Sequence, residues 1–167
     1  MTSAQVGSWD GLRVAVITCS TRAAAGHYPD RGGALIVEAI RSWGALANDP
    51  VVVPDGPAVG EALAAALAAG VDVVLTTGGT GITSSDRTPE ATAPLITAHV
   101  PGIAEALRAA GVSAGVPTAM LSRGLAGLAG QTLIVNLPGS TGGVRDGLGV
   151  LREVVPHAVS QLRGGDH

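Results

Sequence analysis

Residues 71–81 read VDVVLTTGGTG, and this stretch contains the two features that decide the fold. Its first seven residues are rich in Val, Leu and Thr, a composition typical of a strand buried inside a parallel sheet. The glycines that follow interrupt the strand and allow the backbone to adopt positive φ angles. The stretch therefore predicts a buried strand that leads directly into a glycine-rich loop.

Working outward, the same alternation of strand and helix patterns continues in both directions. Short apolar runs predict further strands over 13–19, 50–53 and 132–136, and a short extended piece over 118–121. Helical spacing of apolar residues predicts helices over 34–43, 61–69, 88–97, 101–110, 140–151 and 154–162. This order predicts an α/β fold of three layers, with a mostly parallel sheet and helices on both faces. Without a linker or repeat, we expect one domain over residues 1–167, with a loose start over 1–10.

The composition limits the classes of function. Apolar residues make up 46% of the chain and charged residues 14%, which excludes a disordered polar protein. The net charge of −3 gives no general attraction to nucleic acid or to an anionic membrane. No stretch approaches the roughly 20 apolar residues of a membrane span, and Met1–Asp10 lacks the pattern of a signal peptide. We therefore expect a cytoplasmic protein that binds neither nucleic acid nor membrane.

Residues with reactive or metal-binding side chains are few. The single Cys19 excludes an internal disulfide and a cysteine-based zinc site, and we expect it to be a buried residue at a strand end. The four histidines show no metal-ligand spacing and are predicted to be surface residues or residues satisfied by ordinary hydrogen bonds. All ten basic residues are Arg. A bound phosphate must therefore be held by Arg, by backbone N–H groups or through a metal.

Polar loops follow each predicted strand. In open parallel sheets, ligands bind outside the carboxyl ends of the strands. The loops after the four strands are rich in Gly, hydroxyl groups and carboxylates, and they begin at Ser20–Arg22, Pro54–Gly56, Gly78–Gly81 and Pro138–Thr141. We expect them to converge on one edge of the sheet.

Two of these loops are candidate phosphate sites. Successive N–H groups of Gly78–Gly81 can form a concave anion site, although a simple tight turn would use the same residues. The loop is neither a P-loop, since the chain has no Lys, nor a dinucleotide fingerprint. Pro138–Thr141 precedes a helix whose N-terminus favours anions, and Ser140 is expected to cap that helix.

Asp55 and Asp86 are the candidate metal ligands. Each follows a strand end, where Mg²⁺ could bind one or two carboxylates together with phosphate oxygens. The alternative for Asp55 is an ordinary turn residue. The alternative for Asp86 is a cap on the helix that begins near residue 88. We expect Thr88 to be the N-cap residue of that helix. Asp30 in the first loop could be merely solvated.

Residues 76–91, TTGGTGITSSDRTPEA, resemble the signature of the MogA/MoaB proteins and of the G domains of gephyrin and its plant counterpart. The first loop at 20–30 is similar to the first loop of that family. Later blocks at 53–55, 121–123 and 136–140 match in the same order. The resemblance covers roughly residues 12–163, and the glycine block with Asp86 is its most specific part.

The resemblance implies a molybdopterin adenylyltransferase, usually a homotrimer. Such an enzyme transfers AMP from Mg-ATP to molybdopterin, and its product passes to a downstream molybdate-inserting protein. On this basis Asp55 and Asp86 are catalytic and bind Mg²⁺. The residues implied to contact nucleotide or pterin are Ser20, Arg22, Gly78, Gly79, Thr80, Gly81, Ser122, Arg123, Pro138, Gly139, Ser140 and Thr141.

Two alternatives stay open at this point. The turn Pro138–Thr141 reads Pro-Gly-Ser-Thr, which resembles the MoaB branch, so a catalytically weak paralogue that binds molybdopterin or nucleotide as a scaffold is one alternative. Another is a nucleotide pyrophosphatase of the CinA type, although CinA-like proteins carry an extra domain. The two aspartates favour an enzyme over a scaffold.

Overall fold

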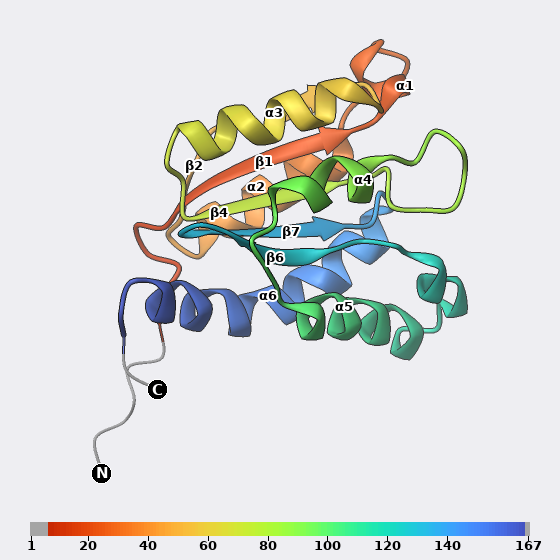
Figure 1. Ribbon diagram of the computed structural model, residues 1–167. Coiled ribbons are helices and arrows are strands. Elements are labelled where there is room, and N and C mark those ends of the chain that lie inside the picture. The colour runs from red at the N-terminus through yellow and green to blue at the C-terminus, as the bar shows by residue number, and fades with distance from the viewer. Residues whose placement is uncertain (1–6, 166–167) are drawn as a thin grey trace.

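A mixed sheet runs through the middle of the protein (Figure 1). The computed structural model describes residues 7–165, and within this range the sheet has seven strands. Their order is β2-β1-β4-β7-β6-β5. The strand β3 pairs with the end of β1, whereas β2 pairs with its beginning. The strands are β1 (Arg13–Cys19), β2 (Leu46–Ala47), β3 (Val51–Val53), β4 (Val73–Thr77), β5 (Ala98–His99), β6 (Ala126–Ala129) and β7 (Thr132–Leu137).

The strand directions bring several loops to one edge. β2, β3 and β4 each pair parallel with β1, and β7 pairs parallel with β4. Only β6 and β5 continue the sheet by antiparallel pairing. The carboxyl ends of the parallel strands therefore share one edge, at the right of Figure 1. The predicted mostly parallel α/β sheet is confirmed.

Helices cover both faces of the sheet, as predicted (Figure 1). One face carries α2 (Arg31–Ser42), α5 (Pro101–Ser113) and α6 (Thr141–Leu162), and the other carries α3 (Pro57–Ala68) and α4 (Thr88–Thr92). Three shorter elements complete the chain: α1 (Thr21–Ala24) and the 3-10 helices η1 (Ala93–Leu95) and η2 (Pro117–Leu121).

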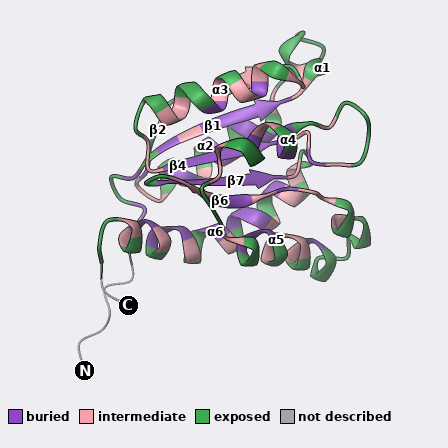
Figure 2. Cartoon of the chain, in the orientation of Figure 1, coloured by how far each residue is buried: buried purple, intermediate pink, exposed green. Residues whose placement is uncertain are grey.

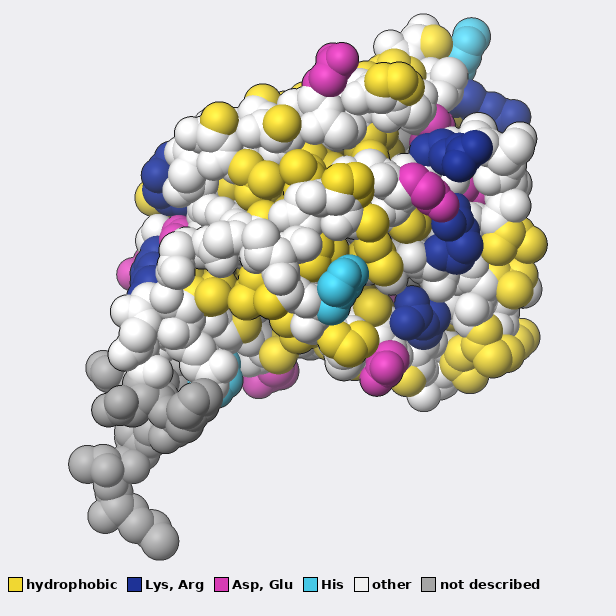
Figure 3. Space-filling model, viewed as in Figure 1, with side chains coloured by type: hydrophobic (Ala, Val, Ile, Leu, Met, Phe, Trp, Pro, Cys, Tyr) yellow, Lys and Arg dark blue, Asp and Glu magenta, His cyan; other side chains and the backbone are white. Residues whose placement is uncertain are grey.

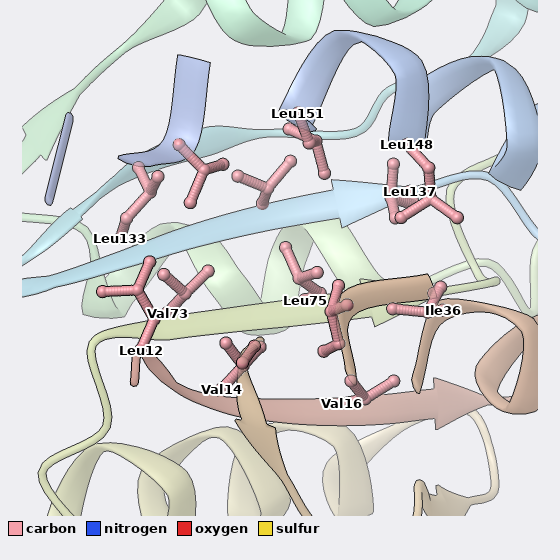
Figure 4. Close-up of a cluster of buried hydrophobic side chains, with 14 of the residues drawn as sticks. Leu12, Val14, Val16, Ile36, Val73, Leu75, Leu133, Leu137, Leu148 and Leu151 are labelled. Atoms are coloured by element: carbon pink, nitrogen blue, oxygen red, sulfur yellow. The ribbon is translucent and has the colours of Figure 1, made fainter. Parts of the chain in front are cut away.

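Alternation along the strands divides the core into two clusters. In β1, Val14 and Val16 pack toward α2 and α6, whereas Ile17 and Cys19 pack toward α3. Burying one Val or Leu side chain stabilises the fold by about 1.5–3 kcal/mol. Figure 2 shows the buried strands between half-exposed helices, and Figure 4 shows the larger cluster. Its labelled members are Leu12, Val14, Val16, Ile36, Val73, Leu75, Leu133, Leu137, Leu148 and Leu151.

The carboxyl-terminal segment forms one helix, where the sequence predicted two. α6 continues through Pro156. Proline has no N–H, so it cannot donate to the carbonyl four residues earlier, that of Arg152. The Trp9 indole Nε1 donates to this carbonyl oxygen instead, at 3.0 Å. A distant side chain thus supplies the missing donor, and the helix is not interrupted.

Other differences from the predicted elements have local causes. Residues 118–121 are part of the 3-10 helix η2 rather than extended, because Ala119 N and Ser122 N each bond a carbonyl three residues earlier. α2 and α3 begin three to four residues before the predicted starts at 34 and 61. The sequence did not predict β2 and β5, of two residues each, or β6, which reads AGLA.

The ends of the described chain lie at the amino edge of the sheet, on the left in Figure 1. Trp9 is buried, and its ring lies 5.1 Å from that of Trp43, so the expected loose start over 1–10 is wrong for this residue. At the other end, Arg163 pairs with Asp72 at 2.7 Å. Residues 1–6 lie outside the described range. No helix within 7–165 is long and apolar enough to cross a membrane.

Candidate functional site

Two cavities open at the carboxyl edge of the sheet. Cavity one, of about 890 Å³, lies between α5, η2 and the loops that follow β4 and β7. Cavity two, of about 910 Å³, lies between the loops that follow β1, β3 and β4. Both are lined by Gly79, Asp86 and Gly139, which we call the shared wall. The loops from separate parts of the chain therefore meet, as the strand pattern led us to expect.

The predicted site residues divide between the two cavities, with one exception. The shared wall contains Gly79, Asp86 and Gly139. Cavity two is also lined by Ser20, Arg22, Asp55, Gly78 and Thr141, and cavity one by Thr80, Gly81, Ser122, Pro138 and Ser140. Arg123 lines neither cavity, because its guanidinium is engaged by backbone carbonyls of the loop after β4 and by Glu90.

The Gly78-Gly79 turn requires glycine at both positions. Their φ angles are +91° and +66°. A Cβ on Gly79 would lie 2.3 Å from Thr88 Oγ1 and 3.0 Å from Asp55 Oδ1. Thr88 closes the turn, since its hydroxyl donates to the Gly78 carbonyl at 2.9 Å and its N–H donates to that of Gly79 at 3.0 Å. The tight turn thus places backbone, with no side chain in the way, against an aspartate.

Asp55 is held by the loop after β1. The backbone N–H and the hydroxyl of Thr21 donate to its Oδ2 at 3.2 and 3.0 Å, and its own N–H donates to the Thr21 hydroxyl at 3.1 Å. This contact fixes one carboxylate oxygen. The other, Oδ1, faces Gly79.

Asp86 is held within its own loop. The N–H and hydroxyl of Thr83 donate to Asp86 Oδ2 at 3.0 and 2.7 Å. The alternative that Asp86 caps α4 is wrong, because the N-cap is Arg87 and its side chain makes no cap hydrogen bond. Thr88 is the first helical residue rather than the N-cap, and its hydroxyl closes the glycine turn instead.

Hydroxyl and carboxylate caps begin the helices around the site. Ser140 accepts from Gly143 N at 3.1 Å, which confirms it as the N-cap of α6. Ser20 accepts from Ala23 N at the start of α1. Asp30 is not merely solvated: its Oδ1 accepts from Gly33 N at the start of α2, and its Oδ2 accepts from the Thr18 hydroxyl.

Arginines supply the positive charge of the cavities. Arg22 and Arg31 line cavity two, and Arg108 and Arg145 line cavity one. Dark-blue Arg side chains gather toward the carboxyl edge in Figure 3. Sequence reasoning named only Arg22 of these four. Arg108 lies on α5, which reaches the site only through tertiary packing, so no local pattern identified it. Arg145 lies one turn into α6, close behind the predicted Pro138–Thr141 turn, and its position in the chain could have identified it.

Asn136 was also missed as a residue that lines cavity one. It is buried in β7, where its amide nitrogen donates to the hydroxyls of Thr76 and Thr92 at 3.0 and 3.1 Å. Its side-chain oxygen accepts from Leu125 N at 3.0 Å. A fully bonded Asn therefore ties β7 to β4 and α4 under the cavity floor. A signal was present, because an Asn inside the apolar run 132–137 is unusual.

Cys19 lies at the end of β1 and is buried, as expected. Burial raises the pKa of its thiol from 9.0 to about 11, a hydrogen bond with Thr88 lowers the pKa in part, and the charge of Asp55 raises it further. The thiol is therefore uncharged at neutral pH, which does not suit a nucleophile. His27, His99 and His157 are exposed, and His167 lies outside the described residues.

The fold and the two cavities at its carboxyl edge agree with a family relationship. The chain belongs to the family described as "Probable molybdopterin binding domain", which matches residues 15–157. It is 42% identical to a molybdenum cofactor biosynthesis bifunctional protein of Synechococcus elongatus, over 98% of this chain and 51% of that protein. The chain thus spans about half the length of that relative.

Two further relatives match over most of their own length. A molybdopterin adenylyltransferase of Pyrococcus furiosus is 36% identical, over 91% of this chain and 92% of that protein. The structure of the molybdopterin biosynthesis Mog protein from Mycobacterium ulcerans superposes with a TM-score of 0.87 at 50% identity, covering 92% and 98% of the two chains. The MogA/MoaB resemblance is therefore confirmed, and with it a place in molybdenum cofactor biosynthesis.

Proposed function

We propose that this protein is a molybdopterin adenylyltransferase that transfers AMP from Mg-ATP to molybdopterin. The observation that carries the proposal is the shared wall, where Asp86, Gly79 and Gly139 line two neighbouring cavities, each in the size range of small-molecule sites. A reaction between two phosphate-bearing substrates needs such a meeting point. The relative from Pyrococcus furiosus that bears the name adenylyltransferase supports the same reaction.

The bond changes of this reaction are simple. An oxygen of the molybdopterin phosphate forms a bond to the α-phosphorus of ATP, the bond between that phosphorus and the bridging oxygen breaks, and pyrophosphate leaves. The protein's own part is to orient the two substrates and to stabilise the charge on the phosphate oxygens. The backbone of Gly78–Gly81 and the capped N-terminus of α6 are suited to this, as are Arg22 and Arg145.

The side chains at the site fit Mg²⁺. Asp55 directs Oδ1 toward Gly79, and Asp86 lies on the shared wall, so both offer hard oxygen ligands near the glycine turn. No group of three or more His, Cys, Asp or Glu suited to a metal ion occurs within residues 7–165. Mg²⁺ commonly takes one or two carboxylates and completes its shell with phosphate oxygens and water. When bound, it would neutralise charge on the phosphates.

The assembly is proposed on the resemblance alone. We propose a cytoplasmic homotrimer whose adenylylated product passes to a molybdate-inserting protein. Sedimentation of the purified chain measures its oligomeric state directly.

The test is pyrophosphate release from molybdopterin and Mg-ATP. The wild-type protein should release pyrophosphate only when both substrates are present, and Asp86→Asn should lower kcat on the order of 100-fold, because a ligand to the phosphate-bound metal is lost. Asp49→Asn is the matched control, since Asp49 is exposed, pairs with Arg41 and lines neither cavity. This control should retain wild-type activity.

The other outcomes separate the alternative functions. Release of pyrophosphate from ATP without molybdopterin would favour a nucleotide pyrophosphatase. Binding of molybdopterin or ATP without any release would favour a scaffold of the MoaB type. Either result would refute the proposed transferase.

A further inference from the structure

The loop that carries Asp86 projects from the carboxyl edge. Residues 82–85 are exposed, and the loop has few contacts of its own besides those between Thr83 and Asp86. An exposed segment of this kind opens easily unless its ends are tied to the body of the protein. What fixes the two ends of the loop therefore determines where the Asp86 carboxylate lies.

Arg123 bonds to both ends of this loop. Its Nε donates to the Gly81 carbonyl at 2.8 Å, and its Nη2 donates to the Asp86 carbonyl at 2.9 Å. Its backbone N–H donates to the Thr80 carbonyl at 2.8 Å. A single planar guanidinium thus spans the loop from Gly81 to Asp86, and it starts from a segment 42 residues away in the sequence from Gly81.

Glu90 orients this guanidinium. Its carboxylate pairs with Arg123 from the first turns of α4. The hydrogen bond from Arg123 lowers the pKa of Glu90, so the pair stays charged at neutral pH. The planar fork allows Arg123 to bond a carboxylate and backbone carbonyls at once, which the point charge of a Lys could not do in the same geometry.

We infer that Arg123, oriented by Glu90, is a positioning residue that holds the 81–86 loop so that Asp86 stays on the shared wall. The link to metal binding rests on the proposed function, whereas the link to loop order does not. Arg123 touches neither cavity, so it acts on the substrates only through the loop.

The first experiment measures loop order without substrates. Arg123→Met keeps an unbranched apolar stem but removes the guanidinium and all of its hydrogen-bond donors. Amide hydrogen exchange at Thr83 and Asp86, which are bonded within the loop, should become about tenfold faster. Arg41→Met is the matched control, because Arg41 makes the same kinds of bond, to the Ala47 carbonyl and to Asp49, at a distant surface. It should leave exchange in the loop unchanged.

The second experiment asks whether Arg123 acts through Asp86. The Mg²⁺ concentration that gives half-maximal ATP binding should rise about tenfold in Arg123→Met, as is usual when the support of a metal ligand is lost. In an Asp86→Asn background the same substitution should have no further effect, because the carboxylate that it positions is absent.

The two experiments test the positioning role of Arg123 and the metal role of Asp86 separately. Unchanged loop exchange in Arg123→Met would overturn the inference, and so would additive effects of Arg123→Met and Asp86→Asn on Mg²⁺ dependence. If Asp86→Asn alone left Mg²⁺ dependence unchanged, the metal role in the proposed function would be refuted. Faster loop exchange would in that case still support the positioning role of Arg123.

Discussion

At the scale of single residues, a methyl group at Gly79 would disturb two side chains of the site. A Cβ there would meet the hydroxyl of Thr88 and the carboxylate of Asp55, and the φ of +66° already disfavours any L side chain. We expect Gly79→Ala to lower the free energy of unfolding and to weaken Mg-ATP binding, measured by urea denaturation and calorimetry.

Gly70 is the matched control for this substitution. Its φ of +68° is nearly the same, but a Cβ there would meet nothing within 4 Å. In Gly70→Ala, the free energy of unfolding should therefore fall only by the cost of the left-handed backbone, about 1–2 kcal/mol, and Mg-ATP binding should be normal. Equal losses of stability in the two variants would contradict the steric role assigned to Thr88 and Asp55.

The buried Cys19 thiol is predicted to make the free energy of unfolding depend on pH in the alkaline range. Its raised pKa means that the folded protein keeps the thiol proton between pH 9.0 and about 11, where the unfolded chain has lost it. The contribution of this group to the free energy of unfolding is therefore constant below pH 9 and decreases as the pH rises toward 11. Because Cys19 is the one cysteine of the sequence, the difference in ultraviolet absorbance between the wild type and Cys19→Ala reports its thiolate directly.

That absorbance difference should rise with a midpoint near pH 11 in the folded protein and near pH 9 in urea. Cys19→Ala should abolish the corresponding slope in stability. A folded-state midpoint near 9 would show that the thiol is not desolvated.

At the scale of elements, α6 depends on a side chain outside itself. The Trp9 indole N–H donates to the Arg152 carbonyl, which Pro156 leaves without a helical partner. Trp9→Phe keeps an aromatic ring but removes this donor, and we expect a loss of about 1–3 kcal/mol in the free energy of unfolding by urea.

Trp43→Phe is the control for the change of ring. The two Trp rings pack on each other, and no hydrogen bond to the Trp43 indole nitrogen is present among residues 7–165. Trp43→Phe should therefore lower the free energy of unfolding by less than Trp9→Phe does. The opposite ranking would show that the Trp9 donor contributes little to α6.

The elements that the sequence predicted are those with strong local patterns. β1, β4 and the run over 132–136 contain several β-branched residues between polar loops, so their strand character is evident. β6 reads Ala-Gly-Leu-Ala and is a strand only because it pairs with β7. The continuity of α6 depends on Trp9, more than 140 residues away, and no window along the chain reveals it.

At the scale of the whole molecule, the location of the site was predictable but its internal contacts were not. Parallel strands bring their carboxyl ends to one edge, so the loops containing Asp55 and Asp86 had to reach the same edge of the sheet. The resemblance placed Arg123 among the pocket residues, whereas the structure shows it tying down the loop that carries Asp86. Such a role requires the segment after η2 to lie against that loop, which spacing in the sequence does not encode.

The described chain enters and leaves the fold at the amino edge, opposite the two cavities. A linker joined at either side would therefore lead an attached module away from the mouths through which substrates arrive. Fusion to another catalytic unit at either end would therefore leave those entrances open to substrates. A bifunctional relative of which this chain matches about half fits that geometry.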